Sequence, residues 1–142
     1  MVDNLKAIGI DAVAEPMNAE TYFSDLADGA CKALCRAGWF ADYPTYDNFM
    51  FDLFASPSIG GNNLGPFSND QFDQLVAEAK QTTDPNDQAE LFQEAERILL
   101  NTDTGVLPLN WYRGDYVYSD DIATFPQSNF GLIAWEQVAF KA

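Results

Sequence analysis

The residues best suited to bind a ligand lie together in the stretch Arg36-Ala-Gly-Trp-Phe-Ala-Asp-Tyr-Pro44. Trp39 and Phe40 form an aromatic pair next to the carboxylate of Asp42, at what we expect to be the end of a strand. An indole offers a flat apolar wall with one N–H donor. A carboxylate beside such a wall can bind a ligand ammonium through a charge-assisted hydrogen bond. Gly38 leaves room for another backbone to approach. These residue types therefore indicate a site for a positively charged group.

The same stretch also has a purely structural interpretation. A strand could run into a turn here, with Trp39 in the core and Asp42 capping the turn. The residue types and their spacing leave both interpretations open.

The sequence lacks the residues of common catalytic centres. It contains no histidine, which excludes Ser-His-Asp and Cys-His systems. The pair Gly60-Gly61 is not followed by the Lys-Ser/Thr that completes a phosphate-binding loop. Because there are 22 acidic residues, chance pairs of carboxylates are common, and a glycosidase-type pair is recognised only from distances. A binding protein without a cofactor is therefore favoured over an enzyme.

Charge and hydropathy narrow the class of partner. The 22 acidic and 7 basic residues give a net charge of −15, which disfavours nucleic acid and anionic membrane surfaces as partners. A hydrophobic content of 47% with 14% aromatic residues indicates a folded chain. No apolar run reaches the roughly 18–20 residues that span a bilayer, and no signal peptide opens the sequence. Leu5 to Ile8 resembles the tail of a helix whose beginning is missing, which favours a piece of a longer protein.

The two cysteines are expected to be unpaired. Cys31 and Cys35 fall in residues 30–40, which we expect to form a buried strand. Strand positions four apart lie ~13 Å apart, whereas a disulfide needs Cα atoms within about 4.4–6.8 Å. We therefore expect two mostly buried, apolar thiols. A zinc site is disfavoured because histidine and a Cys-x-x-Cys motif are both absent.

The elements that position these residues are predicted to be helices and short strands. Ser68 with Gln71 three residues later matches a capping box, and Asp84-Pro85 matches an N-cap followed by proline at the first helical position. The two helices that follow have apolar faces and should form a helical hairpin. Shorter helices are predicted after Asn18 and over residues 48–54, and strands over residues 8–14, 30–40, 106–112, 116–118 and 134–140. The mixture predicts an α/β fold.

Four motifs in order resemble those of the family 5 solute-binding proteins of ATP-binding-cassette importers, whose best-known members are oligopeptide and dipeptide receptors. The first is the stretch 36–44, followed by Asn48-Phe49 and Phe54. The others are Phe67-Ser-Asn-Asp-Gln-Phe-Asp-Gln-Leu75, Asp87-Gln-Ala-Glu-Leu-Phe-Gln-Glu-Ala-Glu-Arg-Ile-Leu99 and Val106-Leu-Pro-Leu109. Each motif alone is weak, but their order and spacing agree over roughly residues 5–140.

This resemblance implies both a fold and a function. Residues 1–142 would be a single domain, the C-terminal fragment of a larger two-lobed receptor. It would form part of the C-terminal lobe of a type II periplasmic binding protein, an α/β fold with a helical hairpin. The receptor would bind oligopeptides or dipeptides and deliver them to permease subunits. Its location would be extracytoplasmic, either periplasmic or as a cell-surface lipoprotein.

The resemblance also assigns roles to individual residues. Asp42 would take the α-amino group of the peptide, and Trp39 would line a side-chain pocket. The backbone around Gly38 and Phe40 would hydrogen-bond the extended peptide by strand addition. Tyr43, in the same stretch, completes the expected set of ligand-binding residues.

Other functions remain open. The same fold could bind a neutral oligosaccharide, with Trp39 stacked on a sugar ring, or a metal chelate. A hydrolase would instead need two carboxyl groups within ~5–10 Å in one cleft. An interaction module would show a continuous exposed apolar patch and no groove.

Overall fold

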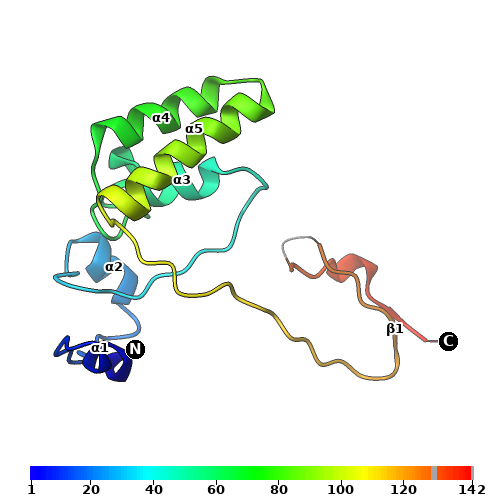
Figure 1. Cartoon of the computed structure of the whole chain (residues 1–142). Coiled ribbons are helices and arrows are strands. Elements are labelled where there is room, and N and C mark those ends of the chain that lie inside the picture. The colour runs from blue at the N-terminus through cyan, green and yellow to red at the C-terminus, as the bar shows by residue number, and fades with distance from the viewer. Residues whose placement is uncertain (129–130, 142) are drawn as a thin grey trace.

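The computed structural model describes residues 1–128 and 131–141, and it is mostly helical (Figure 1). The described residues form five α-helices, three short turn helices, one of which lies between α3 and α4, and a small two-stranded sheet after the α-helices. The α-helices are α1 (Val2–Ala7), α2 (Tyr22–Ala27), α3 (Asp47–Phe54), α4 (Asp70–Gln81) and α5 (Pro85–Arg97). The remaining elements are the 3₁₀ turns η1 (Ser56–Ser58) and η3 (Trp135–Gln137), the π-helical turn η2 (Ile98–Thr102), β1 (Ile122–Thr124) and β2 (Ala139–Phe140).

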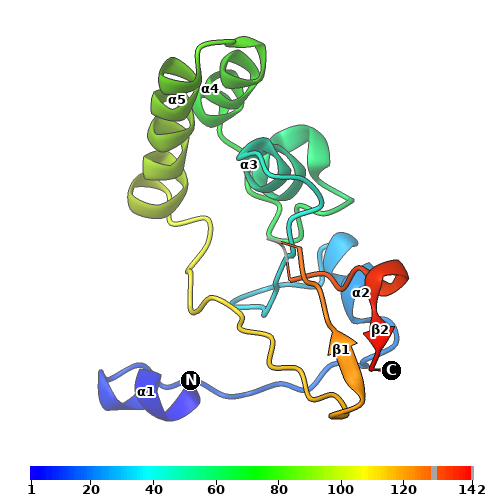
Figure 2. The ribbon, with the colours of Figure 1, turned by 90° about the vertical axis from the view of Figure 1, so that its right-hand side faces the viewer.

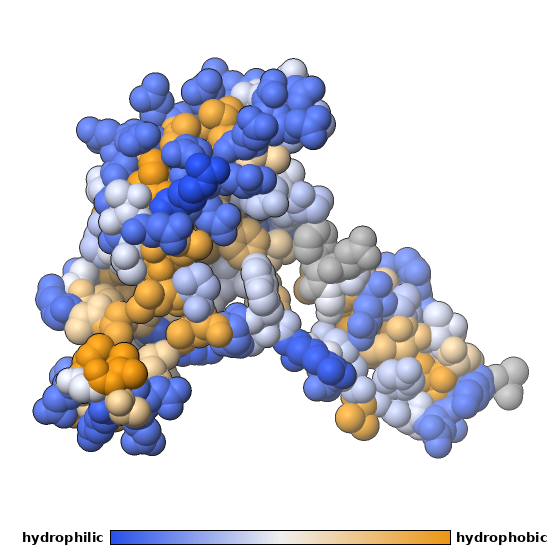
Figure 3. Space-filling view, viewed as in Figure 1, coloured by the Kyte–Doolittle hydropathy of each residue, from blue (hydrophilic) through white to orange (hydrophobic). Residues whose placement is uncertain are grey.

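The predicted helical hairpin is confirmed. Helices α4 and α5 lie side by side, and α3 packs against both (Figure 1). Their apolar faces meet in one core, because the residues at helical spacing point to the same side of each helix. The core contains Met50, Ala55, Phe67, Phe72, Val76, Ala79, Phe92, Ala95, Ile98 and Leu99. Hydrophilic residues cover most of the hairpin's outer surface in Figure 3.

The helix caps are confirmed at one site and displaced at another. Asp84 caps α5 as predicted, and its carboxylate accepts bonds from the backbone N–H groups of Asn86 and Asp87. The cap of α4 is Asn69, whose side chain accepts from the N–H of Phe72 at 2.9 Å. The prediction of Ser68 is therefore wrong by one residue.

The caps expected at Ser68 and Asn18 do not form, because both side chains have other partners. The Ser68 hydroxyl lies 2.8 Å from that of Ser56. Asn18 accepts a bond from the N–H of Glu20 in a turn. Helix α2 then begins three residues later than expected, after Thr21.

The predicted α/β sheet is not present in the described part of the chain. Residues 8–14, 30–40, 106–112 and 116–118 form no strand, and of residues 134–140 only β2 is one. A strand needs a neighbouring ladder to satisfy its N–H and C=O groups. Residues 36–41 and 106–118 lie outside helices and strands and make no backbone–backbone hydrogen bond within the described residues. The chain has the composition of strands there, without a partner.

The small sheet lies away from the helices. Strand β1 pairs antiparallel with β2, with Ile122 opposite Phe140 and Thr124 opposite Ala139. Figure 2 shows the long extended segment that leads from η2 to this pair. No helix in the described ranges is long and apolar enough to cross a bilayer.

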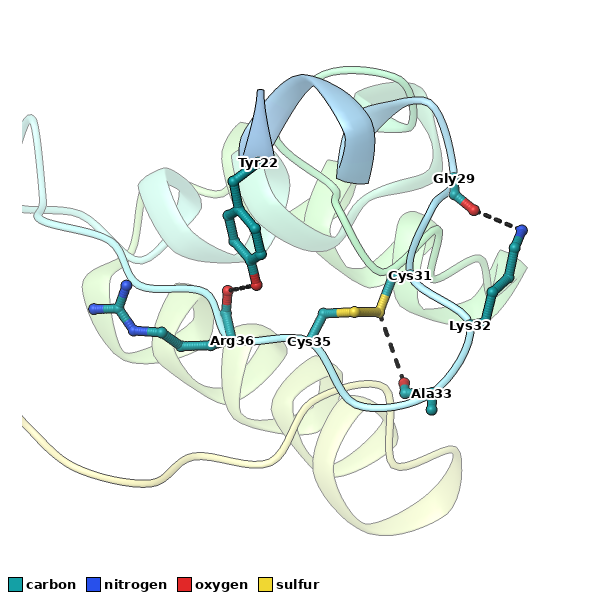
Figure 4. The surroundings of a disulfide bond; sticks show 7 residues. All are labelled: Tyr22, Gly29, Cys31, Lys32, Ala33, Cys35 and Arg36. Atoms are coloured by element: carbon teal, nitrogen blue, oxygen red, sulfur yellow. Dashed lines mark hydrogen bonds between the residues drawn. A yellow bond between two sulfur atoms is a disulfide. The ribbon is translucent and has the colours of Figure 1, made fainter. Parts of the chain in front are cut away.

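The two cysteines form a disulfide, which corrects the expectation of buried free thiols. Cys31 and Cys35 are bonded, with Cα atoms 5.9 Å apart (Figure 4). Because the segment turns here instead of extending as a strand, the Cα atoms come within bonding range. The Lys32 ammonium donates to the carbonyl of Gly29 at 2.7 Å, which holds the same turn. Cys35 is exposed.

Candidate functional site

The stretch that holds the expected ligand-binding residues leads directly into α3, and one side chain of that helix organises it. Asn48 is fully buried. Its carboxamide oxygen accepts the backbone N–H of Asp42 at 2.8 Å and the indole N–H of Trp39 at 3.2 Å. Its nitrogen donates to the carboxylate of Asp52 at 2.8 Å and to that of Asp42 at 3.4 Å.

The chemistry of the partners fixes the orientation of the Asn48 amide. An asparagine side chain has two acceptor positions on oxygen and two donors on nitrogen. The indole and backbone N–H groups can only donate, whereas ionised carboxylates can only accept. All four positions are therefore used, and flipping the amide would break all four bonds.

Asp42 is exposed; its backbone N–H shares the Asn48 oxygen with the Trp39 indole, and its carboxylate contacts the Asn48 nitrogen. No arginine or lysine within the described residues forms an ion pair with it. Asp52 contacts the same Asn48 nitrogen, so two carboxylates approach one amide group. The turn therefore presents negative charge that no cation of the described chain neutralises.

Tyr43 joins this network from the solvent side. Its hydroxyl donates to Asp47 at 3.1 Å and lies 3.4 Å from Asp52. Thr45 also donates to Asp47. Partial desolvation, followed by the bond to Asp47 and the charges of Asp47 and Asp52, raises the pKa of the Tyr43 phenol above its usual value. The phenol is therefore a neutral donor at physiological pH.

Gly38 and Phe40 face a different partner. The ring of Phe40 stacks on that of Tyr112, with centroids 5.7 Å apart and an interplanar angle of 25°. A Cβ placed on Gly38 would lie 3.0 Å from the Tyr112 hydroxyl. The Arg36 guanidinium donates to the same hydroxyl at 3.0 Å. The structure thus places Trp39, Asp42 and Tyr43 around Asn48, while Gly38 and Phe40 contact Tyr112.

Gly38, Phe40, Asp42 and Tyr43 are exposed. A shallow hollow of about 710 Å³ lies elsewhere, between α4 and α5, and includes Leu75, Glu90 and Arg97 in its lining. The described residues contain no group of three side chains placed to hold a metal ion. The turn at Asp42 is therefore one open wall that could contact a ligand.

Three residues of this arrangement were not assigned a role from the sequence: Asn48, Asp52 and Tyr112. A signal existed for the first two, because residues four apart on a helix share one face and here both are polar in a helix whose residues 49–51 and 53–54 are apolar. Tyr112 gave no such signal, since its contact with Phe40 joins two distant parts of the chain.

Comparison with known proteins gives consistent relatives, although no family model matches the chain. The di/tripeptide-binding protein 1 of Pseudomonas aeruginosa is 36% identical over 105 residues, which is 72% of this chain and 19% of that protein. The heme-binding protein A of Haemophilus influenzae is 30% identical over 102 residues, covering 72% of this chain and 18% of that protein. A solved structure of the periplasmic binding protein DppA from Helicobacter pylori in complex with the peptide STSA matches with a TM-score of 0.58 and 28% identity, over 68% of this chain and 19% of that chain.

The chain is homologous to part of a family 5 solute-binding protein. It spans about a fifth of the length of the relatives described above. The resemblance drawn from the four motifs is confirmed, and the fold matches part of a periplasmic binding protein. The solved relative is named as an ABC transporter-associated periplasmic binding protein. Two further relatives, from Salmonella typhimurium and Escherichia coli, are named as periplasmic oligopeptide-binding proteins.

Proposed function

We propose that this chain is the C-terminal part, residues 1–142 forming one domain, of a two-lobed receptor that binds peptides for an ATP-binding-cassette importer. Support comes from relatives that are named as di/tripeptide- and oligopeptide-binding proteins, and from a related structure that holds a peptide. The chain would contribute one wall of the ligand groove, and the remaining walls would come from the rest of the receptor.

Asp42 is the residue that we assign to the peptide's α-amino group. The observation that carries this assignment is an exposed carboxylate with no ion-pair partner in the described chain, held next to the Trp39 indole by Asn48. A peptide ammonium would meet this carboxylate through a charge-assisted hydrogen bond. Closure of the two lobes would exclude water and strengthen that pair. Trp39 would form an apolar wall next to the first peptide side chain, and Tyr43 would border the site.

The backbone around Gly38 and Phe40 would bind the peptide's main chain. Residues 36–41, after the disulfide-bonded turn, make no backbone–backbone hydrogen bond within the described residues. Such a segment can accept an added strand, which provides affinity through main-chain bonds that do not depend on the peptide's sequence. This suits a receptor for peptides of varied composition.

The proposed location is extracytoplasmic, periplasmic or at the cell surface, where the closed receptor would meet its permease subunits. The disulfide between Cys31 and Cys35 supports this location. Disulfides persist in oxidising compartments and are rare where glutathione and thioredoxin keep thiols reduced.

Calorimetry on the complete receptor tests the assignment of Asp42. Asp42→Asn should weaken binding of an alanine tripeptide by about 2–5 kcal/mol, as expected when one partner of a buried charge pair is removed. Acetylating the peptide's amino terminus should weaken binding to the wild-type protein by a similar amount and have little further effect on the variant. Asp120→Asn, which removes an exposed carboxylate in the turn before β1, serves as the control. Unchanged affinity in Asp42→Asn would remove Asp42 from the site.

A non-peptide solute is the second candidate, because one relative is named as a heme-binding protein. A metal chelate or a neutral oligosaccharide would use the Trp39 ring as its main contact. Titration of hemin against the same receptor separates the two candidates. Tight binding of hemin, together with no heat from alanine peptides, would favour the chelate.

A further inference from the structure

We infer that Asn48 is a positioning residue for ligand recognition: it holds the indole of Trp39 and the carboxylate of Asp42 in the arrangement that receives a ligand's ammonium group. The inference rests on the proposed function. Asn48 itself would not touch the ligand, because its side chain is completely buried beneath the turn.

The contacts of Asn48 join the two parts of the proposed site. The oxygen binds the Trp39 indole and the Asp42 backbone, which lie on either side of a two-residue gap in the chain. The nitrogen reaches the carboxylate of Asp42 at 3.4 Å. Trp39 and Asp42 lie outside the described helices and strands, so their own backbone does not fix their relative position. The asparagine, on the first turn of α3, connects both to a packed element.

Helix α3 is a suitable anchor for this purpose. Met50, on the same helix, belongs to the core, and Phe51 and Phe54 pack against it. Tyr46, just before the helix, stacks on Phe92 of α5 with ring centroids 5.6 Å apart. Asn48 therefore connects the exposed turn to the packed helical core through hydrogen bonds.

The Asp52 carboxylate fixes the orientation of the Asn48 amide. The second Asn48 donor is held by the Asp52 carboxylate at 2.8 Å, the shorter of its two carboxylate contacts. This bond keeps the nitrogen on the carboxylate side and the oxygen on the side of Trp39. The longer contact leaves the Asp42 carboxylate oriented but free to accept a stronger, charged donor from a ligand.

A second buried asparagine provides a matched control. Asn63 is also almost fully buried, and it also uses both ends of its amide, accepting from the N–H of Phe67 and donating to the carbonyls of Phe54, Ala55 and Phe67. Its hydrogen-bond partners in the described part of the chain are Phe54, Ala55 and Phe67, away from the turn that carries Trp39 and Asp42. Its loss should affect folding to a similar degree without acting on ligand recognition.

The first experiment is a double-mutant cycle in the complete receptor, with an alanine tripeptide and its N-acetylated form as probes. Asn48→Ala should weaken binding of the free tripeptide about 5- to 30-fold, the size expected for one or two lost hydrogen bonds. In the Asp42→Asn background, or with the acetylated peptide, the same change should alter affinity less than about 3-fold, because interacting residues are not additive. Asn63→Ala should leave the ratio of the two affinities unchanged.

A second variant covers the case in which Asn48→Ala does not fold. Asn48→Leu keeps a side chain of similar size in the buried position and adds no charge next to Asp42 and Asp52, but it makes none of the four hydrogen bonds. It should reduce the preference for the free over the acetylated tripeptide at least about 5-fold.

A ligand-free measurement tests the positioning directly in this chain. With Trp111→Phe and Trp135→Phe, only Trp39 emits, since the chain has three tryptophans. Acrylamide quenching of Trp39 should rise in Asn48→Ala and Asn48→Leu and stay at the wild-type value in Asn63→Ala.

The outcomes separate the inference from the proposed function. A wild-type receptor that binds neither the alanine tripeptide nor an alanine pentapeptide would overturn the proposed function and the inference with it. A receptor that needs Asp42 but responds to Asn48→Ala equally in both backgrounds, or responds to Asn63→Ala in the same way, would overturn the inference alone.

Discussion

Phe40 and Tyr112 stack on one another with ring centroids 5.7 Å apart, although they belong to two extended segments on opposite sides of the helical hairpin in the sequence. This contact, with the bond from Arg36 to the Tyr112 hydroxyl, is what holds the ligand-binding stretch against the segment after η2. Neither segment is fixed by a backbone ladder in the described chain, so side chains alone set their relative position.

Gly38 should be sensitive to substitution only while Tyr112 is present. A Cβ at Gly38 would lie 3.0–3.1 Å from the Tyr112 ring and hydroxyl, closer than ordinary van der Waals contact. In urea unfolding, we expect Gly38→Ala to be about 0.5–1.5 kcal/mol less favourable in the wild-type chain than in a Tyr112→Ala background, the range of a displaced aromatic pair. Equal effects in the two backgrounds would show that the contact is absent in solution.

The disulfide should stabilise the chain modestly. Cys31 and Cys35 close a short loop, with a sequence separation of four, and chain-entropy arguments assign such a loop about 2 kcal/mol at most. Urea midpoints of the wild-type chain should fall when a reductant is added, whereas a Cys31→Ser and Cys35→Ser double variant should not respond. A wild-type chain whose intact mass already corresponds to two free thiols would contradict the bond.

The two candidate caps of α4 can be distinguished by paired substitutions. Asn69→Ala should lower the free energy of unfolding by about 0.5–2 kcal/mol, because the N–H of Phe72 loses its acceptor. Asn69→Ser should restore most of this loss, since serine is an equally good cap. Ser68→Ala should lower the free energy of unfolding by less than Asn69→Ala does. A larger loss in Ser68→Ala would favour the capping box expected from the sequence.

Tyr43 should contribute a pH-dependent part of the stability. Its folded pKa is raised, so the neutral phenol is favoured in the native state, and this contribution is complete below the unfolded value of 10.0 and is lost as the pH rises through the folded pKa. The stability difference between the wild-type chain and Tyr43→Phe should therefore shrink as the pH rises above 10.0. Tyr118→Phe, whose ring stacks on Phe125, is the control. A difference that is constant over this range would place Tyr43 outside the carboxylate network.

Local patterns in the sequence were sufficient for the helical core and for part of the site. The faces of α4 and α5 follow from periodicity, and the Asp84-Pro85 start from capping chemistry, since both depend on neighbours within a few residues. The grouping of Trp39 with Asp42 is also local. The cap of α4 was expected at Ser68, one residue before Asn69, because the sequence does not reveal that the Ser68 hydroxyl contacts Ser56, twelve positions away.

Features that depend on distant partners were not predictable in the same way. Residues 30–40 and 106–112 have strand composition, but a strand exists only where another segment supplies its hydrogen bonds. The expectation of free cysteines depended on that strand and failed with it. Tyr112 could not be connected to Phe40, because nothing in either segment encodes their pairing. Asn48 was part of the first sequence motif, but its four hydrogen bonds were not predicted and are known only from the structure.

The most direct test of Asp42 as the ammonium-binding residue is a crystal structure of the complete receptor with an alanine tripeptide. We expect the terminal nitrogen of the peptide to lie about 2.7–2.9 Å from an Asp42 carboxylate oxygen, with Trp39 beside the first residue. A bound tripeptide whose amino terminus contacts another group, with the Asp42 carboxylate in bulk solvent, would contradict the proposal.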